Sequence, residues 1–169
     1  RVARDLNVLL KISTTINSVG ELSRLQPELL QLIFEVVPAE RGAILLLDKS
    51  DHALTSVYGC HRLRGPDTSI KVSQTITKQV LEEGVALLSN DLFETGGLAD
   101  RPSLIEARVC SVLCVPLTFC QKPLGVIYLD TSDLASRFDE EHLQLLTAIA
   151  GIAAAPFENA NRLEWLQRE

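Results

Sequence analysis

Polar side chains that could hold a ligand gather around one long loop and the strands that follow it. Asn90 and Asp91 begin a segment rich in Gly, Asp and Asn, the kind of loop that often carries binding residues. Paired guanidinium groups near a cavity suit an anionic ligand. Strand alternation allows a serine and a tyrosine to face the same pocket. The candidate ligand-binding residues are Asn90, Asp91, Arg101, Arg108, Ser111, Tyr128, Ile76 and Val80.

A second interpretation fits the same residues. Asn90 and Asp91 are common turn formers, and exposed arginines are ordinarily solvated. Ile76 and Val80 have the spacing of one helix face, so core packing explains them equally well.

Sulfur and imidazole chemistry has weaker support. Cys110 and Cys114 form one closely spaced pair without a second Cys/His pair, so we expect no metal site. Both have the same parity on a strand and are expected to be buried. A thiol redox sensor using Cys110, Cys114 or Cys120 stays open as an alternative.

Composition excludes several classes of protein. The chain has 169 residues, 46% hydrophobic residues and a net charge of −6, which excludes a disordered chain and argues against direct nucleic-acid binding. No apolar run approaches the roughly 18 residues of a membrane span. With no secretory leader at the start, we expect a cytoplasmic protein. The absence of methionine suggests a piece of a longer protein.

The hydrophobic pattern predicts helices and strands in a mixed order. Ser73 can cap a helix that Gly84 ends, and Asp139 can cap the last helix. Pro27 fits a first helical position, and Pro116 suggests a bulge inside a strand. The expected helices are 1–20, 27–37, 74–83 and 139–169, and the expected strands are 42–48, 53–60, 85–89, 109–119 and 124–130.

These elements predict an α+β fold with an antiparallel sheet of five or six strands. Both faces of the last hairpin are apolar, so both must be covered. We expect the terminal helices on one face, and the mid-chain helices and the 90–102 loop over a pocket on the other. The whole chain, 1–169, is expected to form one domain.

Several segments resemble the GAF domain family. Ser111-Val-Leu-Cys-Val-Pro-Leu117 and Pro123-Leu-Gly-Val-Ile-Tyr-Leu-Asp130 are similar to its central signature, and 143–160 is similar to its closing helix. Pro38–Asp48 and Leu88–Asp91 also fit. The sequences of Pro38–Asp48 and Ser111–Asp130 are most similar to those of GAF domains that follow forkhead-associated domains in bacterial signalling proteins.

The resemblance implies a sensory or regulatory domain that is not itself an enzyme. It would bind a small molecule and control an attached sigma-54-type transcription activator, cyclase, histidine kinase of a two-component system, or phosphatase. A ligand-free dimerisation or scaffold module is the alternative. The ligand remains unknown from the sequence.

The motifs of the ligand-binding subgroups are incomplete here. Cyclic-nucleotide GAF domains carry Asn-Lys and Phe-x3-Asp-Glu, whereas Asn90 is followed by Asp91 and Phe138-x3 leads to His142. No Cys-His pair lies where bilin-binding relatives need one, and no histidine is well placed for haem. Cys110 and Cys114 fall within the strand signature rather than upstream of it, where the GAF-fold methionine sulfoxide reductases have their cysteines.

The terminal helices carry apolar residues at heptad spacing. Val2, Leu9 and Ile16 are seven residues apart, and a second seam runs from Leu143 to Ala160. We therefore expect a homodimer through these helices, next to an appended output domain.

Overall fold

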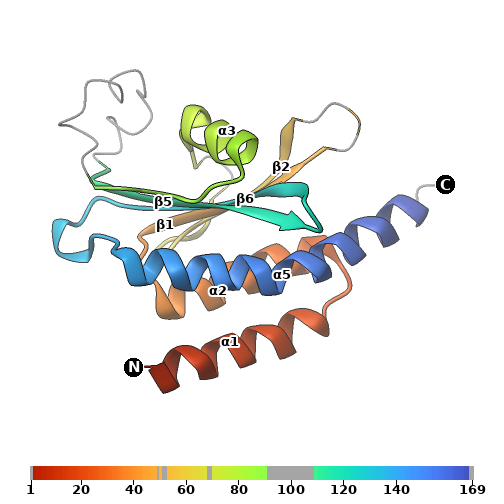
Figure 1. Ribbon diagram of the computed structural model, residues 1–169, viewed down its shortest axis with the longest axis horizontal. Coiled ribbons are helices and arrows are strands. Elements are labelled where there is room, and N and C mark those ends of the chain that lie inside the picture. Colours follow the sequence, from red (N-terminus) through yellow and green to blue (C-terminus); the bar gives the residue numbers. More distant parts are fainter. Residues whose placement is uncertain (1, 49, 51–52, 68–69, 91–108, 168–169) are drawn as a thin grey trace.

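The computed structural model describes residues 2–48, 50, 53–67, 70–90 and 109–167. The chain forms a central sheet with helices on both sides (Figure 1). In chain order the elements are α1 (Val2–Asn17), α2 (Leu22–Val36), β1 (Arg41–Leu47), β2 (Leu54–His61), β3 (Gly65–Pro66), α3 (Gln74–Glu83), β4 (Leu87–Ser89), β5 (Ser111–Phe119), β6 (Lys122–Thr131), the 3-10 turn η2 (Leu134–Ser136) and α5 (Glu140–Gln167).

The six strands form one sheet in the order β3-β2-β1-β6-β5-β4. Every neighbouring pair is antiparallel. β1 and β6 therefore lie in the middle and are buried on both faces, as their continuous apolar sequences require. The predicted α+β class and antiparallel sheet of five or six strands are confirmed.

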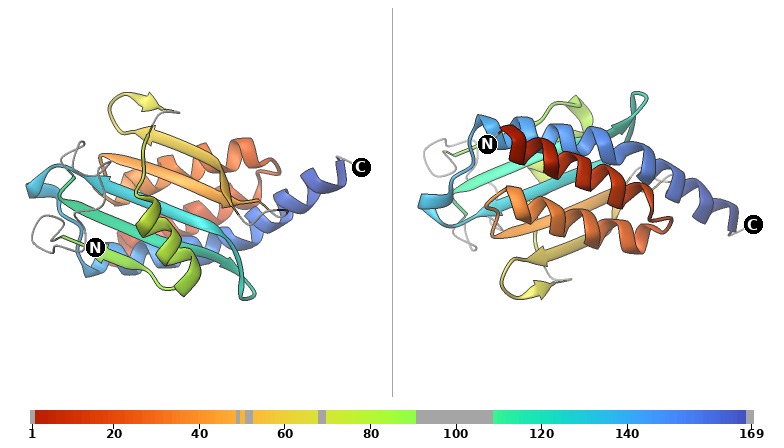
Figure 2. Two further views of the ribbon diagram at one scale, coloured as in Figure 1. Left: turned by 90° about the horizontal axis from the view of Figure 1, so that it is seen from above. Right: turned by 90° about the horizontal axis from the view of Figure 1, so that it is seen from below.

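Helices cover both faces of the sheet, but in different ways. Of the described helices, α3 lies on one face, called here the α3 face, while α2 and α5 cover the other, the helix face (Figures 1 and 2). α1 packs on α2 and α5, so it forms an outer layer. Of the two terminal helices, α5 is the one that contacts the sheet extensively.

The second helix begins earlier than the sequence predicts. Pro27 was expected at its first position, but α2 starts at Leu22 and Pro27 lies inside it. Leu22 and Leu25 are buried in the core on this extra turn. Their burial stabilises the turn by several kcal/mol at about 1.5–3 kcal/mol per side chain, enough to offset the helix hydrogen bond that proline cannot donate.

Two helix starts and one helix end follow local side-chain chemistry. The Ser73 side chain accepts the Ile76 N–H, and Gly84 ends α3 in the left-handed conformation at φ 66°. Asp139 accepts the His142 N–H at 2.9 Å, while His142 Nδ1 accepts the Asp139 N–H at 3.1 Å. The predicted caps at Ser73 and Asp139 are confirmed.

The heptad stripes of the terminal helices are used largely inside the molecule. In the α1 stripe Ile16 is fully buried and Leu9 is partly buried, and most members of the α5 seam are buried. The exposed apolar residues lie elsewhere on the same helices: Leu6 and Leu10 on α1, and Leu163, Trp165 and Leu166 on α5. Among the described residues, no helix is both long and apolar enough to cross a bilayer.

Candidate functional site

The register of the β5–β6 hairpin decides which side chains reach each face. Phe119 pairs with Lys122 around the turn, but a bulge between Leu117 and Thr118 shifts the pairing by one residue. Such a shift turns the following side chains to the opposite face. Cys114 therefore pairs with Tyr128, which lies on the α3 face.

Ser111 and Tyr128 were expected to lie together, and this expectation is wrong. Ser111 has the parity of Leu113, which packs in the core of the helix face. Tyr128 packs with Val112 and Cys114 in the core of the α3 face. The sheet separates the two side chains because the bulge changes the parity of β6 relative to β5.

Ser111 instead joins Asn90 in a polar cluster at the start of α5. Its hydroxyl accepts the Phe138 N–H at 3.1 Å and contacts Asn90 Oδ1. Asn90 Nδ2 donates to the Phe138 carbonyl at 3.0 Å. The side chains of Asn90 and Ser111 thus hold the backbone N–H and carbonyl of Phe138, the residue that directly precedes the Asp139 cap.

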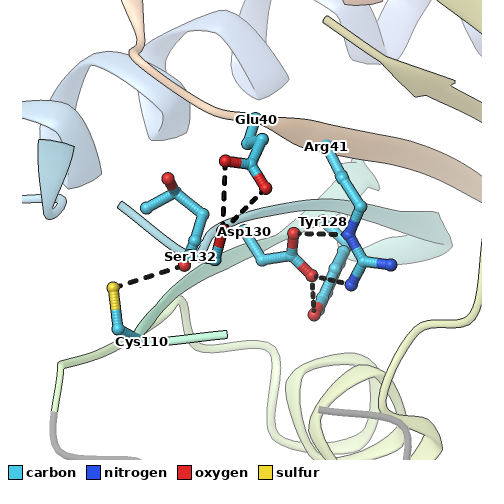
Figure 3. A network of polar contacts seen from close by, with 7 residues as sticks. Glu40, Arg41, Cys110, Tyr128, Asp130 and Ser132 are labelled. Atoms are coloured by element: carbon cyan, nitrogen blue, oxygen red, sulfur yellow. Dashed lines mark hydrogen bonds and ion pairs between the residues drawn. The ribbon is translucent and has the colours of Figure 1, made fainter. Parts of the chain in front are cut away.

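Tyr128 belongs to a buried ionic network with Asp130 and Arg41 (Figure 3). Its hydroxyl donates to Asp130 Oδ2 at 2.7 Å. Arg41 reaches the same carboxylate through Nε at 2.9 Å and through its terminal nitrogen. The side chain of Asp130 is 1% exposed and that of Arg41 is 15% exposed, so this is an ion pair largely removed from water.

Burial and charge raise the pKa values of two members of this network. Burial, followed by the nearby charge of Asp130, raises the pKa of Tyr128 well above its ordinary value. Burial works to lower the pKa of Arg41, but its hydrogen bonds and attraction to Asp130 leave that pKa raised. At neutral pH the phenol is therefore protonated and the guanidinium is charged.

The remaining predicted site residues divide into two groups. Ile76 and Val80 are fully buried and pack with Tyr128 between α3 and the sheet, so they fill the core at this point. Asp91, Arg101 and Arg108 lie outside the described residues.

The α3 face also holds an open cleft of about 1210 Å³ beside α3. Its floor is formed by side chains of β1 and β2, and its walls by the segment before α3 and by α3 itself. Its partly exposed aliphatic residues include Leu54, Val57, Ile70, Val72 and Leu81. A concave, mostly aliphatic surface of this kind is typical of small-molecule sites.

Glycine helps to form one wall of the cleft. A Cβ at Gly59 would lie 2.8 Å from the Asp67 carbonyl oxygen and 3.1 Å from the Ile70 Cβ. Because Gly59 has no side chain, Asp67 and Ile70 can lie close to the backbone of β2. Asp67 donates its N–H to the Gly59 carbonyl at 3.0 Å. Ile70 is thereby placed on the cleft.

Sequence reasoning missed the cleft and the Arg41–Asp130 pair. Asp130 lies near the end of an apolar strand, two residues after Tyr128, so strand parity alone could have placed them on one face. The cleft gave no such signal, because it depends on how closely Asp67 and Ile70 approach Gly59 of β2.

The thiols offer little redox chemistry in this arrangement. Cys60, Cys110 and Cys114 are buried, whereas Cys120 is exposed in the β5–β6 turn. Burial raises the pKa of Cys114 far above its ordinary value, which keeps it a thiol. Cys110 directly precedes β5 and Cys114 lies within it, so at about 3.3 Å per residue of extended chain their Cα atoms are about 13 Å apart, too far for a disulfide.

Metal-binding groups do not converge in the described part of the chain. The structure shows no group of three or more His, Cys, Asp or Glu side chains there that could hold a metal ion.

The six-stranded antiparallel sheet, with α3 on one face and α2 and α5 on the other, is an α+β architecture. The family model described as GAF domain matches residues 21–157. The chain therefore belongs to the GAF domain family, whose members are typically sensory or regulatory parts of signalling proteins. No match was found among curated proteins.

Solved structures share the fold at low sequence identity. A free methionine-R-sulfoxide reductase from Neisseria meningitidis, in complex with its substrate, has a TM-score of 0.74 at 17% identity, over 95% of this chain and 92% of that chain. The GAF domain of an Acinetobacter phosphoenolpyruvate-protein phosphotransferase has a TM-score of 0.71 at 18% identity, over 93% and 94%. The GAF domain of a Bacillus halodurans two-component sensor histidine kinase has a TM-score of 0.65 at 16% identity, over 86% and 99%.

Proposed function

We propose that this GAF domain binds a small molecule in the cleft beside α3 and thereby regulates an attached output domain. The observation that carries the proposal is the open, aliphatic cleft of about 1210 Å³ on the α3 face. Val57 on its floor is 48% exposed, and an apolar side chain in a hollow gains from being covered.

A physical connection links the two faces of the sheet. Alternate residues of β6 enter the two cores, with Val126 and Tyr128 on the α3 face and Ile127 and Leu129 on the helix face. α5 packs on the neighbouring strand β5. A ligand that favours one position of β1 and β6 would therefore shift the population of α5 arrangements.

The output of this domain would be read from its terminal helices. We propose a homodimer in which Leu6 and Leu10 of α1 or Leu163 and Leu166 of α5 are covered by a second copy, because each is at least half exposed. The attached domain would be a sigma-54-type transcription activator, a cyclase, a histidine kinase or a phosphatase. A forkhead-associated domain and a cytoplasmic setting belong to the same proposal.

A regulatory function is favoured over catalysis and over thiol sensing. Three of the four cysteines are buried, and the buried Arg41–Asp130 pair satisfies its own charges. Cys120 is exposed, so rapid labelling of the other thiols in the folded chain would revive the redox alternative. A ligand-free scaffold would follow if the cleft stayed empty in every binding test.

The proposal can be tested by amide NMR during a small-molecule screen. A true ligand should shift the signals of cleft residues such as Val57 and Leu81 and, through the sheet, signals of α5. Val57→Glu places a carboxylate on the apolar floor and should abolish binding. Val85→Glu is the matched control, since Val85 is 62% exposed and does not line the cleft. A ligand that binds the Val57→Glu variant with unchanged affinity would contradict the proposal.

A further inference from the structure

The lining of the cleft narrows the class of ligand. We infer that the cleft takes a free monocarboxylate with an aliphatic or alicyclic body, an inference that rests on the proposed function. The argument uses the chemistry of the apolar surface, the position of two lysines, and the side-chain types that the lining lacks.

The apolar part of the lining is made entirely of aliphatic residues. Leu54 and Val57 come from β2, Ile70 and Val72 from the segment before α3, and Leu81 from α3. All five remain partly or largely exposed although they face a hollow. An aliphatic body would cover them, and each buried methylene contributes about 0.8 kcal/mol.

Two cations stand beside this apolar surface. Lys71 lies between Ile70 and Val72 on the wall, and Lys78 lies on α3. Within the described part of the chain Lys71 has no ion-pair partner, while Lys78 has only an exposed contact of 4.0 Å with Glu82. Glu82 also lines the cleft, so the described lining carries a net charge of +1. In a chain with a net charge of −6, this local excess of positive charge favours an anionic head group.

The side chains that other ligand classes need are not found among the described residues of the lining. That lining has no aromatic ring on which a nucleobase could stack, and no arginine for bidentate contact with a phosphate. It also has no histidine, cysteine or methionine that could act as an axial ligand for haem. Lysine binds as a point charge, which is sufficient for a single carboxylate.

The experiment compares octanoate, 1-octanol and cyclic GMP as probes of the whole chain by NMR titration. Octanoate and octanol share an eight-carbon chain and differ in the charge of the head group. We expect octanoate to bind the cleft at least about tenfold more tightly than octanol. The variant Lys71→Gln/Lys78→Gln should remove this preference and leave the affinity for octanol unchanged.

The control variant is Lys11→Gln/Arg24→Gln, which removes the same charge from exposed positions away from the cleft. It should leave the octanoate affinity unchanged. Equal affinities of octanoate and octanol at the cleft, or loss of binding in the control variant as well, would overturn the carboxylate assignment. Tighter binding of cyclic GMP at Val57 and Leu81 would overturn the aliphatic assignment. These outcomes would overturn the class of ligand but not the proposal that the cleft binds a small molecule. That proposal fails only if no compound in the wider screen binds the cleft.

Discussion

The buried pair of Arg41 and Asp130 gives a sharp test of the structure. Replacing Arg41 with methionine keeps much of the aliphatic volume but removes both hydrogen bonds to the carboxylate. Asp130, 1% exposed, would keep only the hydroxyl of Tyr128 as a side-chain partner. An uncompensated buried charge of this kind costs about 3–5 kcal/mol, so Arg41→Met should lower the free energy of unfolding by that amount.

The same reasoning predicts a partial rescue. In Arg41→Met/Asp130→Asn the isolated charge is gone, so the double variant should be at least about 2 kcal/mol more stable than Arg41→Met alone. Arg24→Met is the control, because the Arg24–Glu28 pair is exposed and contributes at most about 0.5 kcal/mol.

Urea unfolding followed by far-ultraviolet circular dichroism measures all of these quantities. The wild type, Arg41→Met, Asp130→Asn and the double variant form a complete double-mutant cycle. A loss below about 1 kcal/mol for Arg41→Met would mean that the pair behaves like an exposed one. The absence of rescue in the double variant would refute the argument that the buried charge causes the loss.

Three further predictions concern backbone packing, the start of α5 and alkaline pH. Gly125→Ala should lower the free energy of unfolding by at least about 3 kcal/mol, because the new Cβ would lie 2.0 Å from the Leu45 carbonyl oxygen. The control is Gly151→Ala, on an exposed helix face with nothing within 4 Å of the new Cβ, which should raise the free energy of unfolding by about 1 kcal/mol. A urea series with similar losses for both would contradict the packing. Ser111→Ala leaves the buried Phe138 N–H without its acceptor, so the free energy of unfolding should fall by about 1–3 kcal/mol and hydrogen exchange at that amide should become faster. An unchanged exchange rate would count against the cluster of Ser111, Asn90 and Phe138. Burial raises the pKa of Cys114, so above the ordinary thiol pKa the folded chain keeps a proton that the unfolded chain releases. The free energy of unfolding should therefore be constant with respect to this group below the ordinary thiol pKa and fall as the pH rises above it. Cys114→Ala should reduce this fall in a pH series of unfolding curves, and an equally steep fall would refute the assignment.

Local signals in the sequence predicted much of the fold. α3 has the predicted bounds because Ser73 and Gly84 satisfy the ends of the helix through their own chemistry. Asp139 is the predicted cap of α5, although His142 rather than an acidic residue completes the reciprocal contact. Pro27 misled the prediction because the burial of Leu22 and Leu25, a tertiary effect, extends α2 beyond it.

The site could be predicted only in part, because it depends on register. Pro116 indicated an irregularity in its strand, and the bulge lies just beyond it, between Leu117 and Thr118. Its exact place decides whether Tyr128 faces Ser111 or lies on the other side of the sheet, and no local pattern fixes that choice. The cleft likewise depends on the long-range approach of Asp67 and Ile70 to Gly59.

The exposed end of α5 has a consequence for spectroscopy. Trp165 is the single tryptophan of the chain, and it is 50% exposed beside Leu166. Its fluorescence emission will therefore change little when the distant core between α3 and the sheet opens. It will shift to shorter wavelength when another surface covers the end of the helix, so the chain carries its own optical probe of assembly.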